Sequence, residues 1–285
     1  MLEIRFPFDR AFRIAQLTDL CLADPNGIAE HETLRFLERL FAGEKPDLVI
    51  VTGGLAEPPL QAELFQLFCD FMDWQGIRWA FAFGDRDRSC AVPARALESI
   101  LLASRTCLYE RGDPHVHGEG NYCISLCGAD QAPRWLLYLL DSGTESGAPY
   151  MAHTVIGWCR RARAAAPEDS RLLYFFHRPL PEFSELMPPE RKEAVAETPL
   201  NSGFFASVAA DARSAGIFAG QPNGFGCSVE KDGIRCAYGV RSGVPPYSAE
   251  RSNAARGWRT ILLPAQPSRP VETYARSDAG QSRYP

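Results

Sequence analysis

The chain has 285 residues, of which 46% are hydrophobic and 23% charged, with a net charge of −5 at pH 7. This length fits one large globular domain, and the mixture of 30 basic and 35 acidic residues leaves no basic surface for nucleic acid. The sequence has no apolar run of about 18 residues, and Met1–Arg10 is charged, so we expect neither a membrane span nor a signal peptide. Scattered cysteines without a Cys-x-x-Cys pair favour a cytoplasmic location.

The first third of the chain alternates buried strands with amphipathic helices. Short apolar runs at Phe12–Thr18, Asp47–Thr52 and Ile77–Phe83 are typical of buried parallel strands. Between them, Glu32–Phe41 and Leu60–Trp74 carry apolar residues at spacings of three and four, which predicts helices. These segments form consecutive βαβ units.

The rest of the chain predicts more strands than helices. The expected helices are Pro93–Ala103, Thr154–Ala166 and Asn201–Ala215. The expected strands are Asn121–Cys127, Trp135–Leu140, Arg171–Phe176, Gly216–Ala219, Gly226–Glu230, Ile234–Tyr238, Trp258–Leu263 and Val271–Ala275. We expect residues 1–275 to form a single domain, residues 276–285 to be a frayed polar tail, and Arg178–Pro199 to be a loop that serves or covers a site.

Functional residues are expected directly after the strands, because ligands of open α/β sheets bind beyond the carboxyl ends of the strands. The segments at these places are Thr18-Asp19-Leu20-Cys21, Thr52-Gly53-Gly54-Leu55, Phe83-Gly84-Asp85-Arg86-Asp87, Phe176-His177-Arg178-Pro179 and Ala219-Gly220-Gln221-Pro222-Asn223. In order and spacing they resemble the motifs of the calcineurin-like metallophosphoesterase superfamily: Asp-x-His, Gly-Asp, Gly-Asn-His-Asp/Glu, His and Gly-His-x-His. The flanking residues are most similar to the purple-acid-phosphatase-like phosphohydrolase branch.

The resemblance implies both a fold and a chemistry. The fold is a four-layer α/β/β/α sandwich, in which two mixed β-sheets pack face to face with helices outside. The chemistry needs two divalent cations, one carboxylate shared between them, and imidazoles from several strand ends, so that a phosphoryl oxygen is clamped and a water activated.

Most of the metal ligands that the resemblance implies are replaced. Asp19 and His177 match family ligands, but Cys21 stands for a family His, Gly54 for the bridging Asp and Asp85 for the family Asn. Because glycine has no side chain with which to bridge two metals, we expect the standard dimetal site to be lost.

The remaining family positions are also changed. Arg86 stands where the resemblance implies a catalytic His, and the two His of the last motif are Gln221 and Asn223. We expect the neighbouring Asp87 to pair with Arg86 or Arg88.

Two interpretations of the pocket stay open. In one, no cofactor is bound, Arg86 pairs with Asp19 and Asp85 in place of the metals, and Arg86 and Arg178 can hold an anion. In the other, one divalent metal, zinc, manganese or iron, is held by a rebuilt site of Asp19, Cys21, Asp85 and His177.

The sequence therefore predicts a pseudoenzyme, a phosphatase homologue that is inactive or strongly impaired and that acts as a binding or regulatory protein. Its partner would be a phosphorylated small molecule or another protein. The alternative is an active phosphomonoesterase or phosphodiesterase that uses the rebuilt single-metal site. A purely structural role, with Arg178–Pro199 as the contact surface, is a third interpretation.

Overall fold

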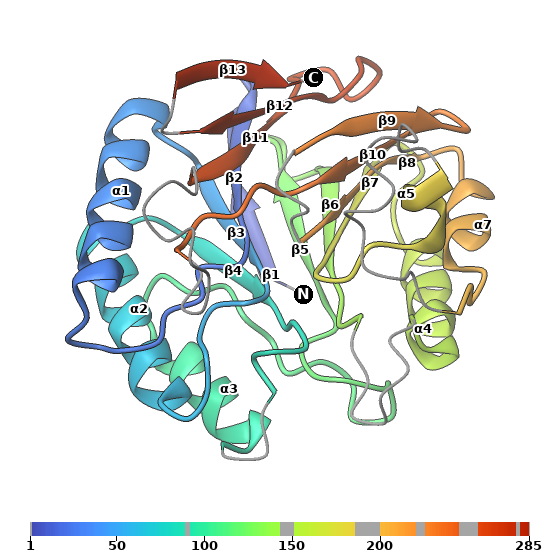
Figure 1. Cartoon of the computed structure of the whole chain (residues 1–285). Coiled ribbons are helices and arrows are strands. Elements are labelled where there is room, and N and C mark those ends of the chain that lie inside the picture. Colours follow the sequence, from blue (N-terminus) through green and yellow to red (C-terminus); the bar gives the residue numbers. More distant parts are fainter. Residues whose placement is uncertain are drawn as a thin grey trace.

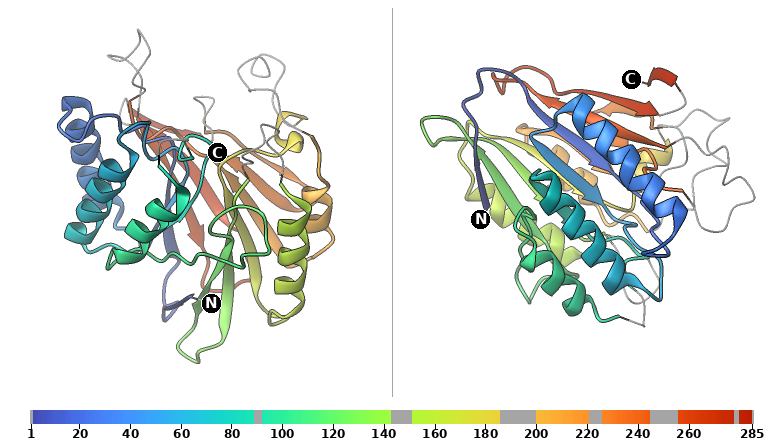
Figure 2. Two further views of the ribbon diagram at one scale, coloured as in Figure 1. Left: turned by 90° about the horizontal axis from the view of Figure 1, so that it is seen from below. Right: turned by 90° about the vertical axis from the view of Figure 1, so that its left-hand side faces the viewer.

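Two β-sheets lie face to face at the centre of the molecule, and helices cover their outer faces (Figure 1). The computed structural model describes residues 2–88, 92–142, 151–185, 200–220, 226–244, 256–277 and 280–284. The three views agree that α1, α2 and α3 lie on one side of the paired sheets and that α4, α5 and α7 lie on the other (Figures 1 and 2). The predicted four-layer α/β/β/α sandwich is confirmed.

The first sheet has six strands in the order β13-β12-β11-β2-β3-β4. Its strands are β2 (Phe12–Leu17), β3 (Leu48–Thr52), β4 (Trp79–Ala82), β11 (Gly257–Leu263), β12 (Glu272–Ser277) and β13 (Gly280–Tyr284). The parallel strands β2, β3 and β4 are connected by α1 (Ile28–Glu44) and α2 (Gln61–Gln75), and α3 (Ala94–Ala103) packs beside α2. This part of the fold reproduces the predicted βαβ units.

The second sheet has seven strands in the order β1-β5-β6-β7-β8-β10-β9. Its strands are β1 (Leu2–Arg5), β5 (Tyr122–Cys127), β6 (Pro133–Leu139), β7 (Arg171–Phe176), β8 (Ser214–Ala219), β9 (Ser228–Lys231) and β10 (Ile234–Tyr238). The helices on its outer face are α4 (His153–Ala164), α5 (Pro181–Glu185) and α7 (Phe204–Ala209). Parallel and antiparallel pairs occur in both sheets, so both are mixed.

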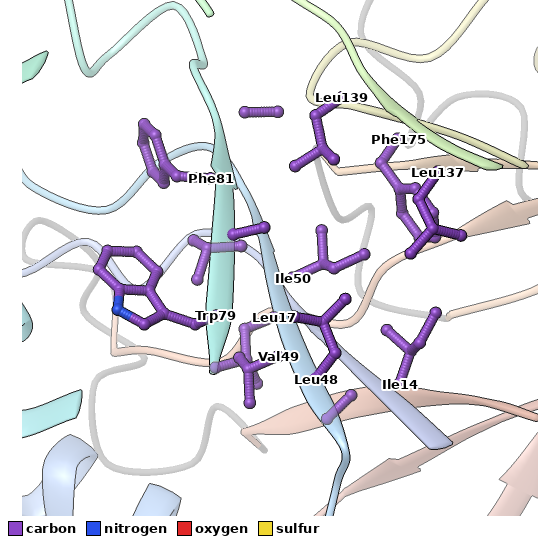
Figure 3. Close-up of a cluster of buried hydrophobic side chains, with 14 of the residues drawn as sticks. Ile14, Leu17, Leu48, Val49, Ile50, Trp79, Phe81, Leu137, Leu139 and Phe175 are labelled. Atoms are coloured by element: carbon purple, nitrogen blue, oxygen red, sulfur yellow. The ribbon is translucent and has the colours of Figure 1, made fainter. Parts of the chain in front are cut away.

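Alternate residues of a strand belong to two different hydrophobic cores. In β7, Leu173 and Phe175 lie in the core between the sheets, whereas Leu172, Tyr174 and Phe176 pack against the helices of the outer layer. Figure 3 shows part of the core between the sheets, where side chains of β6 and β7 meet those of β2 and β3. Both faces of the central strands are buried, which explains why they are continuous apolar runs in the sequence.

The structure differs from the expected elements mainly at the two ends of the chain. Residues 276–285 are not a frayed tail in the described part, because β12 continues to Ser277 and β13 pairs antiparallel with it. The edge of β12 offers backbone partners to these residues, and their polar composition hides this from sequence analysis. β1, which was not predicted, adds to the edge of the second sheet by pairing in parallel with β5.

Two predicted segments of the middle region are also corrected. The helix expected over residues 201–215 is limited to α7, since β8 already begins at Ser214. The expected loop Arg178–Pro199 contains α5, and its residues 186–199 lie outside the described part. Among the helices that the structure describes, none has the length and apolar character needed to cross a membrane.

Asp73, near the end of α2, holds the segment that follows α3. Its carboxylate accepts hydrogen bonds from the hydroxyl of Ser104, the N–H of Arg105, and both the N–H and the hydroxyl of Thr106, over distances of 2.7 to 3.0 Å. Burial alone would raise the pKa of Asp73, but these hydrogen bonds lower it to about 2. The same segment forms a bridge between Cys107 and Trp79 of β4, so Asp73 connects α2 to the edge of the first sheet.

We expect Asp73→Ala to lower the free energy of unfolding at neutral pH by about 2 kcal/mol, because its hydrogen bonds to the ionised carboxylate are lost. This stabilisation is present above the unfolded-state pKa of about 4 and is lost as the pH falls toward the folded-state pKa of about 2. Urea unfolding should therefore show a difference from wild type that narrows below about pH 4. Asp70→Ala, at an exposed position of the same helix, is the control, and equal losses in both variants would contradict the prediction.

Candidate functional site

The ends of strands from both sheets meet and bring the motif residues together. Asp19 and Gly53 follow β2 and β3 of the first sheet, and the N–H of Asp19 donates to the carbonyl of Gly53 at 3.0 Å. His177 and Gly220 follow β7 and β8 of the second sheet, and Gly220 N–H donates to the carbonyl that precedes His177 at 2.8 Å. Gln16 connects the sheets through hydrogen bonds from its amide to β3 and β8. The candidate site therefore lies where hydrogen bonds connect the two sheets.

His177 joins the second sheet to the first. Its side chain is 3% exposed, Nδ1 lies 2.8 Å from the carbonyl oxygen of Thr52, and Nε2 lies 3.1 Å from Oδ1 of Asp85. Burial alone would lower the pKa of His177, but the charge of Asp19 and the hydrogen bond to Asp85 raise it to about 9. Both ring nitrogens face oxygen acceptors, so each of them donates a proton.

Three glycines leave room for the His177 ring. A Cβ atom at Gly53 or Gly220 would lie 2.7 or 2.8 Å from Nδ1, and one at Gly84 would lie 2.8 Å from Cγ. Non-bonded atoms of this size pack best at about 3.5–4.0 Å. The glycines of the strand-end motifs are therefore needed for packing around one side chain.

Asp85 is shared between His177 and Arg178. Its Oδ1 accepts the proton of His177 Nε2, and its Oδ2 lies 2.5 Å from a terminal nitrogen of Arg178. Burial opposes ionisation, but the hydrogen bonds from His177 and Arg178 outweigh it and lower the pKa of Asp85. The guanidinium beside this carboxylate thus comes from the second sheet.

Arg86 lies elsewhere than the sequence predicted. Its guanidinium is 2.7 Å from Glu57 Oε1, and its side chain is 54% exposed. It therefore pairs with Glu57, and the prediction that it pairs with both Asp19 and Asp85 is wrong. Glu57 is a buried carboxylate in the loop after β3. Because an unpaired buried charge is costly, its pairing with Arg86 lowers the free energy of the folded state.

Asp19 and Cys21 lie beside Gly54. Both have left-handed backbones, with φ of 50° and 49°, and Cys21 N–H donates to the carbonyl of Gly54 at 2.9 Å. Burial raises the pKa of Asp19, against the charge of His177, and burial also raises the pKa of the Cys21 thiol. Gly54 has φ of 68°, and a Cβ there would lie 2.9 Å from both Cα and Oδ1 of Asp19. A side chain at position 54 would have to displace Asp19.

Asp87 organises the turns after β3 and β4. Its side chain is fully buried, and its two oxygens accept backbone N–H groups at 2.8 Å from Gly54, Leu55 and Gly84. Burial raises the pKa of Asp87 to about 6, although these hydrogen bonds favour the ionised form. The expected pairing with Arg86 or Arg88 is wrong, because main-chain donors take both carboxylate oxygens.

The residues present do not fit the metal centre that the sequence resemblance implies. Among the described residues, no group of three or more His, Cys, Asp or Glu could hold a metal ion. All four ligands expected for a rebuilt single-metal site are described, namely Asp19, Cys21, Asp85 and His177. His177 and Asp85 instead form a hydrogen bond with each other. His177 also contacts the carbonyl of Thr52, and Asp85 also pairs with Arg178. Gln221 and Asn223, the last two replaced ligand positions, lie outside the described residues.

Two charged residues near the site, Glu57 and Arg241, were not predicted from the sequence. Arg241 lies on the segment after β10, which crosses to the first sheet, where the N–H of the next residue donates to the carbonyl of Thr18 at 2.9 Å. The rule that functional residues follow strand ends would have pointed to Arg241, since β10 ends at Tyr238.

Comparison with known proteins supports the assignment of the fold. No family model matches the chain. Over 86% of its length the chain is 25% identical to the "Probable inactive purple acid phosphatase 14" of Arabidopsis thaliana, and the match covers 74% of that protein. A dimetal phosphatase from Danio rerio has a TM-score of 0.61 at 12% identity, covering 93% of this chain and 99% of that one. The calcineurin-like phosphoesterase YfkN from Bacillus subtilis has a TM-score of 0.52 at 11% identity, covering 96% and 93%.

We expect Gly84→Ala to destabilise the protein by about 1–3 kcal/mol, because its Cβ would enter the space of the His177 ring. Gly43→Ala, in α1 with no atom within 4 Å of the added Cβ, is the matched control and should be neutral or slightly stabilising. Thermal unfolding measures both.

A double-mutant cycle tests whether overlap with the His177 ring causes the destabilisation by Gly84→Ala. In a His177→Ala background the ring is absent, so Gly84→Ala should cost much less than it does in the wild type. Strictly additive effects of the two substitutions would contradict this account.

Proposed function

We propose that this chain is a member of the calcineurin-like metallophosphoesterase superfamily, a catalytically inactive or strongly impaired phosphohydrolase that acts by binding. Its pocket would take a phosphorylated small molecule or a protein partner. The relative from Arabidopsis thaliana that carries "inactive" in its name supports the first part of this proposal.

The observation that carries the proposal is the geometry at Gly54. Dimetal hydrolysis requires a carboxylate that both cations share, and the resemblance assigns that carboxylate to position 54. Gly54 supplies no ligand, and the space where a side chain would start lies 2.9 Å from Asp19. The turn is fixed in this form by Asp87, which accepts the N–H of Gly54. Neither the ligand nor the space for it exists.

The neighbouring ligand positions are engaged in other contacts. Each nitrogen of His177 faces an oxygen acceptor, and Asp85 receives a guanidinium. An active enzyme with a single metal would need at least three of the candidate ligands to converge, and in the described residues they do not. The geometry therefore favours binding over hydrolysis.

We also propose a cytoplasmic location. All eight cysteines of the described residues are free thiols, which suits a reducing compartment.

Metal analysis combined with an activity assay tests the proposed loss of catalysis. The full chain, produced with added zinc, manganese and iron, is expected to hold far less than about one metal ion per molecule by mass spectrometry. We also expect no hydrolysis of p-nitrophenyl phosphate or bis(p-nitrophenyl) phosphate, because the bridging carboxylate is missing.

Asp19→Ala and His177→Ala serve as controls for the assay. Slow hydrolysis that persists in both variants indicates a contaminating phosphatase and leaves the proposal standing. About one tightly bound metal per chain, with turnover that either substitution abolishes, would overturn it.

A further inference from the structure

Three arginines act on the carboxylates of the pocket. Arg178 binds Asp85 directly, and Arg86 binds Glu57. Arg241 forms a β-bridge with Thr18, the residue that precedes Asp19. Burial raises the pKa of Asp19, and the charges of His177 and Arg241 oppose that effect. Guanidinium groups keep their charge at every physiological pH. The site that holds cations in the family is here lined with fixed cations.

Two of these arginines have donors without acceptors. Among the described residues the Arg241 side chain forms no hydrogen bond or ion pair, whereas its backbone is held by a hydrogen bond from Gly257 to its carbonyl and by a bridge to Thr18. The Nε atom of Arg178 is buried and has no hydrogen-bond partner. A buried N–H without an acceptor costs free energy, and an oxyanion would supply the missing acceptors.

We propose that Arg178 and Arg241 form a metal-free site for a tetrahedral oxyanion, the phosphate of a monoester, and that Asp85 is an internal anion that competes with this ligand for Arg178. The inference rests on the proposed binding function and specifies its ligand chemistry. It assigns to Asp85 a role opposite to that of a metal ligand, since the carboxylate here weakens binding.

The position of Asp85 supports this competition. Its side chain is 39% exposed, so an incoming anion can reach it. Its Oδ2 accepts a hydrogen bond from a terminal nitrogen of Arg178, which an anion would otherwise receive. A phosphate monoester carries more charge and more acceptor oxygens than a carboxylate, and guanidinium groups bind it through paired hydrogen bonds. When phosphate replaces Asp85 at Arg178, the guanidinium stays paired while the orphan Nε and Arg241 gain acceptors.

Isothermal titration calorimetry of the full chain with inorganic phosphate, after treatment with EDTA, tests the proposal. Saturable binding is expected in the wild type. Asp85→Asn should bind phosphate about tenfold more tightly, because a neutral amide competes less for Arg178. Arg241→Gln should weaken binding about tenfold or more through loss of a charge-assisted hydrogen bond.

Arg235→Gln is the matched control. It removes a guanidinium that pairs with Glu230 at the opposite end of β10, and its phosphate affinity should equal that of the wild type. Circular dichroism establishes that each variant is folded. Arg241→Gln removes no side-chain contact of the described residues, so it reports on binding even where Asp85→Asn lowers stability.

Three results would overturn the inference. The first is the absence of saturable phosphate binding in both the wild type and Asp85→Asn, and the second is an unchanged affinity in Arg241→Gln. Either can occur while metal and turnover are absent, so the proposed loss of catalysis would survive. The third is phosphate binding that appears only when a divalent metal is added back, which together with turnover would overturn both proposals.

Discussion

The contact of His177 with the end of β3 is the constraint on which the pocket depends. A ring from the second sheet lies against the backbone of the first, and its Nδ1 reaches the carbonyl of Thr52. The space exists only because Gly53, Gly84 and Gly220 have no Cβ. These glycines begin the turns that carry the other motif residues, so the positions of Asp19 and Asp85 follow from the packing of one side chain.

The same contact explains how the pocket accommodates its changed residues. With Nδ1 directed at Thr52, only Nε2 faces the centre of the pocket, and Asp85 lies in front of it. A neutral amide at position 85 could leave Nε2 of His177 free to bind a metal. A carboxylate instead favours a proton on Nε2, and its second oxygen pairs with a guanidinium. Asp85 thereby converts a ligand position into part of an ion-pair network with Arg178. A carboxylate at position 85 thus favours a protonated His177 and the Arg178 guanidinium over a metal ion.

Sequence patterns predicted the fold well because the central strands are buried on both faces. The apolar run of β7 predicts this strand at the bounds that the structure shows, and the strand-end rule locates Asp19 and His177. Side-chain pairing could not be predicted in this way. Arg86 pairs with Glu57, whose position depends on the conformation of a loop. Asp87 accepts hydrogen bonds from backbone N–H groups, which no sequence pattern reveals. The polar last strand depends on a free sheet edge, which is also invisible in sequence.

The hydrophobic cores that stabilise the fold are separate from the candidate site at the strand ends. The two hydrophobic cores lie between the sheets and beneath the outer helices, and they supply the apolar burial that stabilises the sandwich. The strand ends must still accommodate two buried carboxylates, Asp19 and Glu57, beside the partly exposed carboxylate of Asp85. Metal cations solve this by coordination, and arginine side chains solve it by paired hydrogen bonds. Because a guanidinium has more donors than one carboxylate can fill, the replacement leaves N–H groups for an anionic ligand. The proposed loss of hydrolysis and the proposed anion site would then be two consequences of the same substitution of cations.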